Sequence, residues 1–282
     1  MPAGSRIVSS TPAQMRRPAN SQRHRLTHRD GNGEILFGAL LEYHDLQTSI
    51  TYQHAENQWK FPVPKFDEKI LPKVIGKLRN KKPVSIVVLG DSISSGCNAS
   101  GWAGGEPFQP AYPELLQQHL AAEYQTQVKL ANPSVGGMST PWALTMVDTV
   151  VKSKPDLLIL AFGMNDSAGR STKDYQAYTK QMIEKVRQEL PDCEFILVAT
   201  MLGNADWTVL KHERFPEYRD ALAELCGPGV ALADVTTMWT GILKHKTFID
   251  ITGNGVNHPN DFGHRVYAQT ISGLLVEPKI TK

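Results

Sequence analysis

The stretch VVLGDSISSG, residues 87–96, joins an apolar run to a turn rich in Gly, Asp and Ser. The apolar run, SIVVLG (85–90), shows no polar alternation, which is typical of a strand buried on both faces of a sheet. Ser92 follows the strand directly. A serine in that place is either an exposed nucleophile or a turn residue that caps the next helix, and the turn alone does not separate these roles.

Beyond residue 84 the chain alternates apolar runs with helical patterns. Four more strands are predicted, at VKLANP (128–133), DLLILAFG (156–163), EFILVAT (194–200) and VALAD (230–234). Helices are predicted near 111–124, 141–153, 172–189, 214–226 and 260–276. Alternating units of this length predict an α/β fold, with a parallel sheet and helices on both faces. Ligands bind at the carboxyl ends of the strands in such sheets, so the residues after each strand are the candidates for a site.

Composition excludes several other classes of protein. Of the 282 residues, 41% are hydrophobic and 21% charged, as in ordinary soluble proteins, and the formal net charge of +2 gives no reason to expect a nucleic-acid partner. No apolar run approaches the roughly 20 residues of a membrane span. The three cysteines, an odd number at scattered spacing, indicate neither a disulfide framework nor a zinc site. They favour a reducing compartment, so a cytoplasmic location is predicted.

The first 32 residues differ from the rest. They hold six arginines among Ser, Pro, Asn and Gln, and Asp30 is their only acid. Without an apolar h-region, no secretory signal is predicted. An organellar transit peptide is the alternative, but the stretch lacks a convincing amphipathic helix, so residues 1–32 are predicted to be a flexible basic tail.

Residues 33–82 are predicted to form a β-rich accessory segment before a main domain at 83–282. Turn signals divide 33–62 into two or three strands, too few to be stable without packing on that domain. FPVPKF (61–66) is typical of a linker, and a short basic helix is expected over 67–81.

Residue types suited to acyl transfer follow the predicted strands. Ser92 follows the first, Gly136 and Gly137 the second and Asn165 the third, and His258 lies just before the last helix. Acyl transfer needs a hydroxyl nucleophile, an imidazole that takes its proton, and N–H donors aimed at the developing oxyanion. Glycine lets a backbone N–H approach a substrate closely, and asparagine supplies an amide donor. These loops therefore predict an acyl-transfer site.

Each of these residues also has an ordinary structural explanation. The two glycines can form a plain turn, Asn165 can cap the following helix, and His258 can lie in a surface loop. The glycine-rich stretch 96–105 lacks the G-K-[ST] ending of a phosphate-binding loop. Four separate coincidences at one edge of a sheet are a weaker explanation than one site.

The chain resembles the SGNH hydrolase superfamily, also called the GDSL esterases and lipases, over residues 83–275. Ser92 falls in the GDS block of that family and is the implied nucleophile. Gly137, in NPSVGG, matches the oxyanion glycine, Asn165, in GMND, matches the oxyanion asparagine, and His258, followed by Pro259, is the implied general base. No G-x-S-x-G elbow of the α/β-hydrolases surrounds the serine.

The resemblance implies a flavodoxin-like three-layer α/β/α sandwich and a serine esterase without a metal or organic cofactor. It also implies that the backbone N–H groups of Ser92 and Gly137 and the Asn165 side chain bind the oxyanion. Asp91 is expected to organise the turn around the nucleophile.

One position departs from the family pattern. The family usually has an aspartate three residues before the histidine, whereas this chain has Gly255. That aspartate normally holds the imidazole in the tautomer with a proton on Nδ1. A backbone carbonyl in 253–257 can replace it and give a Ser-His dyad, as in certain carbohydrate acetyl esterases of the superfamily. Asp250 or Asp261 can reach the histidine instead, or the protein only binds a ligand. The dyad is the favoured interpretation.

Two loops are expected to shape the substrate pocket. The glycine-rich loop 94–113 carries Trp102 and Phe108, and the loop 204–215 carries Trp207. These aromatic side chains suit stacking on sugar rings, but they equally suit packing on the protein's own surface. Nothing in the sequence is typical of a membrane-binding helix. A small-molecule or carbohydrate ester, with a short acyl group such as acetyl, is the predicted substrate, and a lysophospholipase or thioesterase is the alternative. The sequence does not indicate an oligomeric state.

Overall fold

The computed structural model describes residues 24–31, 33–38, 40–47 and 61–278. Most of the predicted basic tail and the strands expected within 48–60 lie outside these residues.

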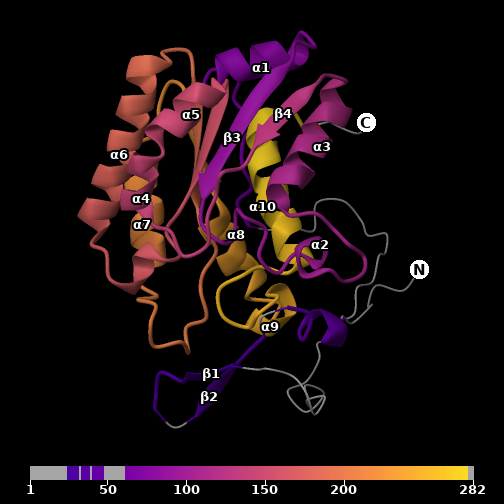
Figure 1. Ribbon diagram of the computed structural model, residues 1–282, viewed down its shortest axis with the longest axis vertical. Helices are drawn as coiled ribbons and strands as arrows, with labels where there is room; N and C mark the ends of the chain where they lie inside the picture. The colour runs from indigo at the N-terminus through magenta and orange to yellow at the C-terminus, as the bar shows by residue number, and fades with distance from the viewer. Residues whose placement is uncertain (1–23, 32, 39, 48–60, 279–282) are drawn as a thin grey trace.

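A parallel five-stranded sheet forms the centre of the main domain (Figure 1). Its strands are β3 (Val84–Gly90), β4 (Val128–Ala131), β5 (Leu157–Ala161), β6 (Glu194–Ala199) and β7 (Val230–Asp234). They lie in the order β4-β3-β5-β6-β7. Numbered from β3, this is the 2-1-3-4-5 order of flavodoxin-like sheets, in which ligands bind at the switch point where the order reverses. All five predicted strands are confirmed.

Helices cover both faces of the sheet (Figure 1). One face packs against α1 (Pro72–Arg79), α3 (Tyr112–Tyr124), α8 (Val235–Ile242) and α10 (Asp261–Leu275). The other face packs mainly against α4 (Thr140–Thr145), α5 (Val147–Ser153), α6 (Thr172–Glu189) and α7 (Arg214–Ala223). Alternate residues of β3 belong to the two cores, because successive side chains of a strand point to opposite faces: Val88 joins the first core and Val87 the second. The predicted α/β sandwich is confirmed.

The predicted helix over 141–153 is two helices in the structure. Met146 separates α4 from α5 with a backbone at φ −97° and ψ 2°, outside the helical region. Three short helices were not predicted: α2 (Ser100–Ala103), α8 and α9 (Phe248–Ile251). Segments of four to eight residues offer too little periodicity for a pattern to be recognised.

The described part of the segment before the main domain starts with an antiparallel hairpin. It is formed by β1 (His24–Thr27) and β2 (Glu34–Phe37), and the 3₁₀ helix η1 (His44–Leu46) follows. Residues 24–27, at the end of the predicted tail 1–32, are therefore a strand in the structure, where β1 pairs with β2. Arg29, just after β1, donates hydrogen bonds to the carbonyls of Ala205, Trp207 and Leu210, and these contacts fix the hairpin on the main domain.

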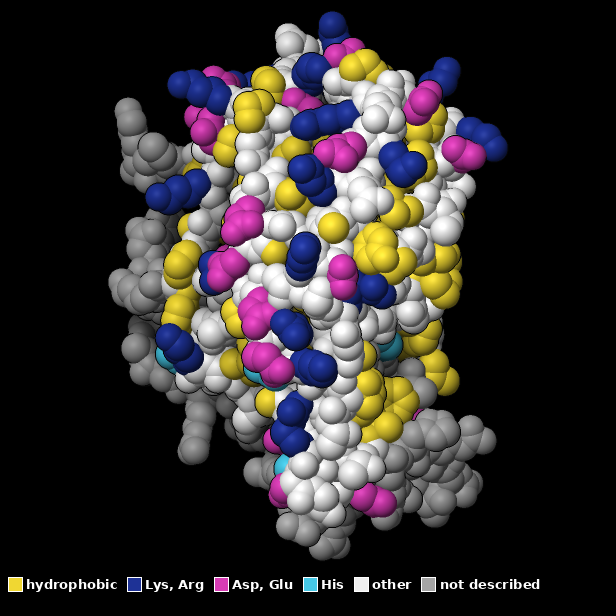
Figure 2. All heavy atoms as spheres, turned by 90° about the vertical axis from the view of Figure 1, so that its left-hand side faces the viewer, with side chains coloured by type: hydrophobic (Ala, Val, Ile, Leu, Met, Phe, Trp, Pro, Cys, Tyr) yellow, Lys and Arg dark blue, Asp and Glu magenta, His cyan; other side chains and the backbone are white. Residues whose placement is uncertain are grey.

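Charged side chains of both signs are interspersed over the face formed by α4 to α7 (Figure 2). Pairs such as Lys180 with Glu184, 3.8 Å apart on α6, contribute to this mixture. Within the described ranges, no helix combines the length and the apolar character that crossing a membrane requires.

Candidate active site

Ser92 lies in the turn that follows β3. Gly90 ends that strand, and a Cβ at this position would overlap with the Ser94 side chain and with the carbonyl of Ala161 on β5. The turn can therefore pack against the sheet only with glycine there. Asp91 is buried and accepts a hydrogen bond from the Ile93 N–H at 3.0 Å, while burial raises the pKa of its carboxyl group to about 7. Asp91 thus stabilises the turn that carries Ser92.

His258 ends a tight turn before α10. The Asn254 Oδ1 accepts hydrogen bonds from three consecutive backbone N–H groups, those of residues 256, 257 and 258, at 2.9, 3.0 and 3.1 Å. Gly255 lies within this turn at φ +76°, a left-handed backbone that favours glycine. The geometry of the turn therefore favours glycine at this position.

Ser92, His258 and Asn98 form a hydrogen-bonded chain. Ser92 Oγ lies 2.8 Å from His258 Nε2, and His258 Nδ1 lies 2.8 Å from Asn98 Oδ1. The Asn98 Nδ2 donates to the carbonyl of Gly253 at 3.1 Å, which sets the orientation of the amide. Asn98 Oδ1 can then only accept, so His258 Nδ1 carries the proton and Nε2 accepts from the Ser92 hydroxyl. This is the tautomer that a general base requires.

The acids proposed from the sequence do not contact His258 Nδ1. The Asp250 Oδ2 accepts from the N–H and hydroxyl of Thr247 and caps α9. The Asp261 carboxylate accepts from the N–H and hydroxyl of Ser100, both at 2.7 Å, and joins α10 to α2. In the structure the partner of His258 Nδ1 is the Asn98 side chain, and not Asp250, Asp261 or a backbone carbonyl of 253–257.

Asn98 was missed because its role depends on a contact across 160 residues. A weak local signal existed: asparagine tolerates a left-handed backbone better than most residues, and Asn98 has φ +65°. Its side chain is 1% exposed, as expected for a polar group whose hydrogen bonds are made inside the protein.

The loop after β4 packs against the nucleophile turn. The Ser134 Oγ accepts from the Gly90 N–H at 2.9 Å, and the Asn132 Nδ2 donates to the Ser94 carbonyl at 2.7 Å. Gly137 has φ +79°, which favours glycine, and follows Gly136, where a Cβ would lie 3.6 Å from the Ser92 Cβ. The loop thus passes beside Ser92 at Gly136.

Asn165 follows β5, the strand next to β3 at the switch point. Its Nδ2 donates to the Met138 carbonyl at 2.9 Å, one residue beyond Gly137. An amide group has two N–H bonds, and this contact uses one of them. The structure thus brings Asn165 to the same loop as Gly137.

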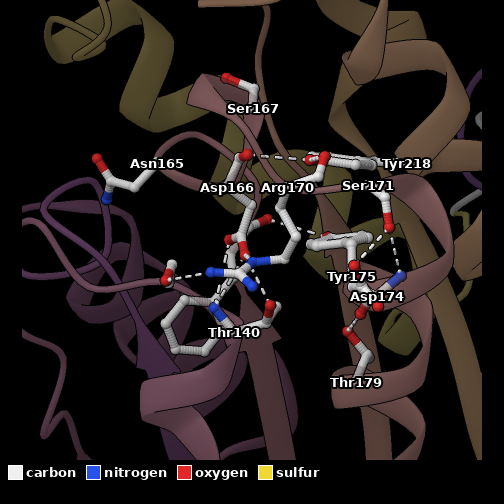
Figure 3. A network of polar contacts seen from close by, with 12 residues as sticks. Thr140, Asn165, Asp166, Ser167, Arg170, Ser171, Asp174, Tyr175, Thr179 and Tyr218 are labelled. Atoms are coloured by element: carbon white, nitrogen blue, oxygen red, sulfur yellow. Dashed lines mark hydrogen bonds and ion pairs between the residues drawn. The ribbon is translucent and has the colours of Figure 1, made fainter.

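Asp166 connects the loop that carries Asn165 to the loop that carries Gly137 (Figure 3). Its carboxylate is buried and accepts from the Thr140 N–H and hydroxyl, and from Arg170 Nε at 2.6 Å. Arg170 also donates to the Ser139 hydroxyl at 3.3 Å. The Asn165 side chain points away from this network in Figure 3. The network therefore holds the loops of Gly137 and Asn165 together without using the Asn165 amide.

Burial also determines the charge of the histidine. Desolvation lowers the pKa of His258 to about 4, so its imidazole is neutral at neutral pH. A neutral imidazole with a proton on Nδ1 can take the proton of Ser92.

The three aromatic residues expected to bind substrate differ in exposure. Trp102 on α2 is 47% exposed and lies beside Gly96 of the nucleophile turn. Phe108 is 59% exposed. Trp207 is half-buried and packs against the first core. Packing against the protein's own core thus explains much of the Trp207 side chain, whereas Trp102 and Phe108 have exposed apolar surface.

The described residues form no cluster of metal-binding side chains. Over the part of the chain that the structure describes, His, Cys, Asp and Glu do not gather in threes that could hold a metal ion.

Comparison with known proteins agrees with the fold. Residues 88–266 match the model of the GDSL-like lipase/acylhydrolase family. The chain therefore belongs to this family, the GDSL or SGNH hydrolases. It is accordingly a carboxylic ester hydrolase. No curated protein matches the chain.

Solved structures with the same fold include several esterases. A two-domain esterase, CEX, active on acetylated mannans, has a TM-score of 0.58 and 18% identity, and the match covers 74% of this chain but only 53% of CEX. A lipase from a goat rumen metagenome has a TM-score of 0.55 and 15% identity, and the match covers 67% of this chain and 96% of the lipase. Axe2, an acetylxylan esterase from Geobacillus stearothermophilus, has a TM-score of 0.53 and 15% identity, and the match covers 67% of this chain and 92% of Axe2. At these identities the likeness shows the shared fold.

Proposed function

We propose that the protein hydrolyses short-chain acyl esters, in the first place acetyl esters of carbohydrates, through an acyl-enzyme formed on Ser92. The hydrogen-bonded chain from Ser92 through His258 to Asn98, at the switch point of the sheet, is the observation that carries this proposal. It supplies a nucleophile, a base and an orienting group in contact with one another.

The reaction follows from these contacts. The Ser92 Oγ attacks the ester carbonyl carbon while its proton moves to His258 Nε2. The backbone N–H groups of Ser92 and Gly137 and the second amide N–H of Asn165 stabilise the oxyanion. When the tetrahedral intermediate collapses, the alcohol leaves with the proton from Nε2. Water then attacks the acyl-enzyme, again with His258 as base, and the carboxylic acid is released.

Asn98 acts differently from the usual aspartate. Its Oδ1 accepts the Nδ1–H and so fixes the tautomer and direction of the imidazole. As a neutral group, it stabilises the imidazolium less than a carboxylate does. The site is then a Ser-His-Asn arrangement in which orientation is retained and charge stabilisation is weaker.

The pH dependence of kcat/KM tests this assignment. Activity requires neutral His258, whose pKa is lowered to about 4 by burial, so we expect a plateau at neutral pH and a fall only as the pH drops through about 4. In Asn98→Asp, a carboxylate beside Nδ1 favours the imidazolium, so the acid limb should move to higher pH.

Asp250→Asn is the matched control, because the Asp250 carboxylate caps α9 and does not contact the histidine. Its acid limb should coincide with that of the wild type. A wild-type limb at the ordinary histidine value of 6.5, or an unmoved limb in Asn98→Asp, would contradict the assignment.

Acetyl esters of carbohydrates are supported by two observations. CEX is active on acetylated mannans and Axe2 is an acetylxylan esterase, and both share this fold. Trp102 and Phe108 expose apolar surface on the segment that follows the nucleophile turn. Aromatic faces of this kind suit stacking on sugar rings.

Acyl-chain preference separates the proposed substrates from longer-chain ones. With p-nitrophenyl acetate, butyrate and octanoate, we expect kcat/KM to fall with each increase in chain length. Buffer without protein corrects for the spontaneous hydrolysis of these activated esters. A rise from acetate to octanoate would overturn the short-chain proposal and favour a lipid or thioester substrate.

A further inference from the structure

The segment before the main domain lies against both loops that carry the Asn98–His258 hydrogen bond. It lies outside the residues that match the family model, 88–266. Figure 1 shows the β1–β2 hairpin at the end of the molecule where α9 lies. Gly38, just after β2, donates its backbone N–H to the carbonyl of Asn254, at 3.3 Å, in the turn that carries His258.

His44, the first residue of η1, holds the turn that carries Asn98. Its Nε2 lies 2.9 Å from the Asn98 carbonyl oxygen, and because a carbonyl only accepts, His44 donates. His264 on α10 donates in the same way to the preceding carbonyl, that of Cys97, at 3.3 Å. Two histidines thus fix adjacent peptide groups of this turn, one from the main domain and one from the segment before it.

Gln47, three residues later, holds the loop that leads to His258. Its Nε2 donates to the carbonyls of Ile249 and Thr252, both at 2.9 Å. Its Oε1 accepts from Asn260 Nδ2, also at 2.9 Å. The side chain therefore joins the residues on both sides of the histidine turn.

The spacing of the two side chains suits this arrangement. Residues i and i+3 of a 3₁₀ helix lie on the same side of the helix, and the Gln47 N–H donates to the His44 carbonyl at 3.1 Å. His44 therefore contacts the Asn98 turn while Gln47 contacts the loop of His258.

We propose that His44 and Gln47 form a staple, a pair of positioning residues that fixes Asn98 against His258. Gly38, His44 and Gln47 then support the active site from outside the main domain. This inference rests on the proposed function, because it assigns the staple to the Ser-His-Asn chain. The staple acts through Asn98 and His258 and does not touch the substrate.

The test begins with His44→Phe, which keeps a ring but removes the N–H donor. We expect kcat for p-nitrophenyl acetate to fall about tenfold while KM stays within about twofold, since a small displacement of a catalytic group lowers the rate of the chemical step. His44→Gln retains an N–H donor and should recover most of the activity. Asp45→Asn changes an exposed neighbour in the same turn and should leave kcat unchanged.

A double-mutant cycle distinguishes positioning from a general structural effect. Asn98→Ala alone should lower kcat by about 10²-fold. If His44 acts through Asn98, adding His44→Phe to Asn98→Ala should lower kcat little further. Losses that multiply would overturn the proposal, as would an unchanged kcat in a folded His44→Phe protein.

Gln47→Met keeps the same test available if His44→Phe does not fold, because methionine has a similar length but makes none of the three hydrogen bonds. We expect a similar fall in kcat at constant KM, and an unchanged kcat would overturn the staple. A wild-type protein that neither hydrolyses esters nor reacts with a fluorophosphonate would overturn the proposed function and this inference with it. An active wild type with unaffected variants overturns the staple alone.

Discussion

Ser92→Ala is expected to abolish ester hydrolysis, with a loss in kcat of about 10⁶-fold, the magnitude found when the nucleophile of a serine hydrolase is removed. The physical reason is that the only step the remaining site can assist is direct attack by water. Hydrolysis of p-nitrophenyl acetate measures the loss. Labelling by a fluorophosphonate should disappear in parallel, since this reagent needs an activated serine.

Ser153→Ala is the control for this variant. Ser153 is an exposed residue at the end of α5, and its hydroxyl bonds only to its own helix, at the Thr149 carbonyl. Full activity is expected there. Labelling that persists in Ser92→Ala would identify a different nucleophile, and a wild type that resists labelling would show that Ser92 is not activated.

The sequence predicts the fold well because its strands are buried on both faces. In β3 and β5, nearly every residue is apolar, so the two strands can be recognised without knowing their neighbours. The edge strand β4 is more exposed and ends sooner than predicted, at Ala131 before Pro133. The position of Ser92 and Asn165 at one edge of the sheet then follows from strand direction alone.

Other parts of the site depend on contacts between distant segments. Asn98 meets His258 across 160 residues, and His44 meets Asn98 across 54, so no local pattern reports either contact. Gly255 shows the reverse case. The sequence correctly marks it as a departure from the family, but only the structure shows the left-handed turn, held by Asn254, that favours glycine at this position. The local sequence pattern therefore does not report the backbone conformation or the long-range contacts on which the site depends.

Asn165→Ala is expected to lower kcat by about 10²- to 10³-fold, the usual loss when one oxyanion donor is removed. The amide N–H meets a full negative charge only in the transition state, so KM should change little. Steady-state kinetics with p-nitrophenyl acetate separate the two parameters. Asn80→Ala, which removes an exposed amide at the end of α1, is the matched control and should retain full activity.

The same variant also loses the hydrogen bond from Asn165 to the Met138 carbonyl, so loop displacement has to be separated from loss of the donor. Asn165→Asp does this, because it preserves the size of the side chain but places an acceptor, and at neutral pH a negative charge, beside the oxyanion. We expect Asn165→Asp to be less active than Asn165→Ala. If alanine and aspartate are equally impaired, or if KM rises while kcat is retained, Asn165 holds the loop or the ground-state substrate and the oxyanion is stabilised by the backbone N–H groups alone.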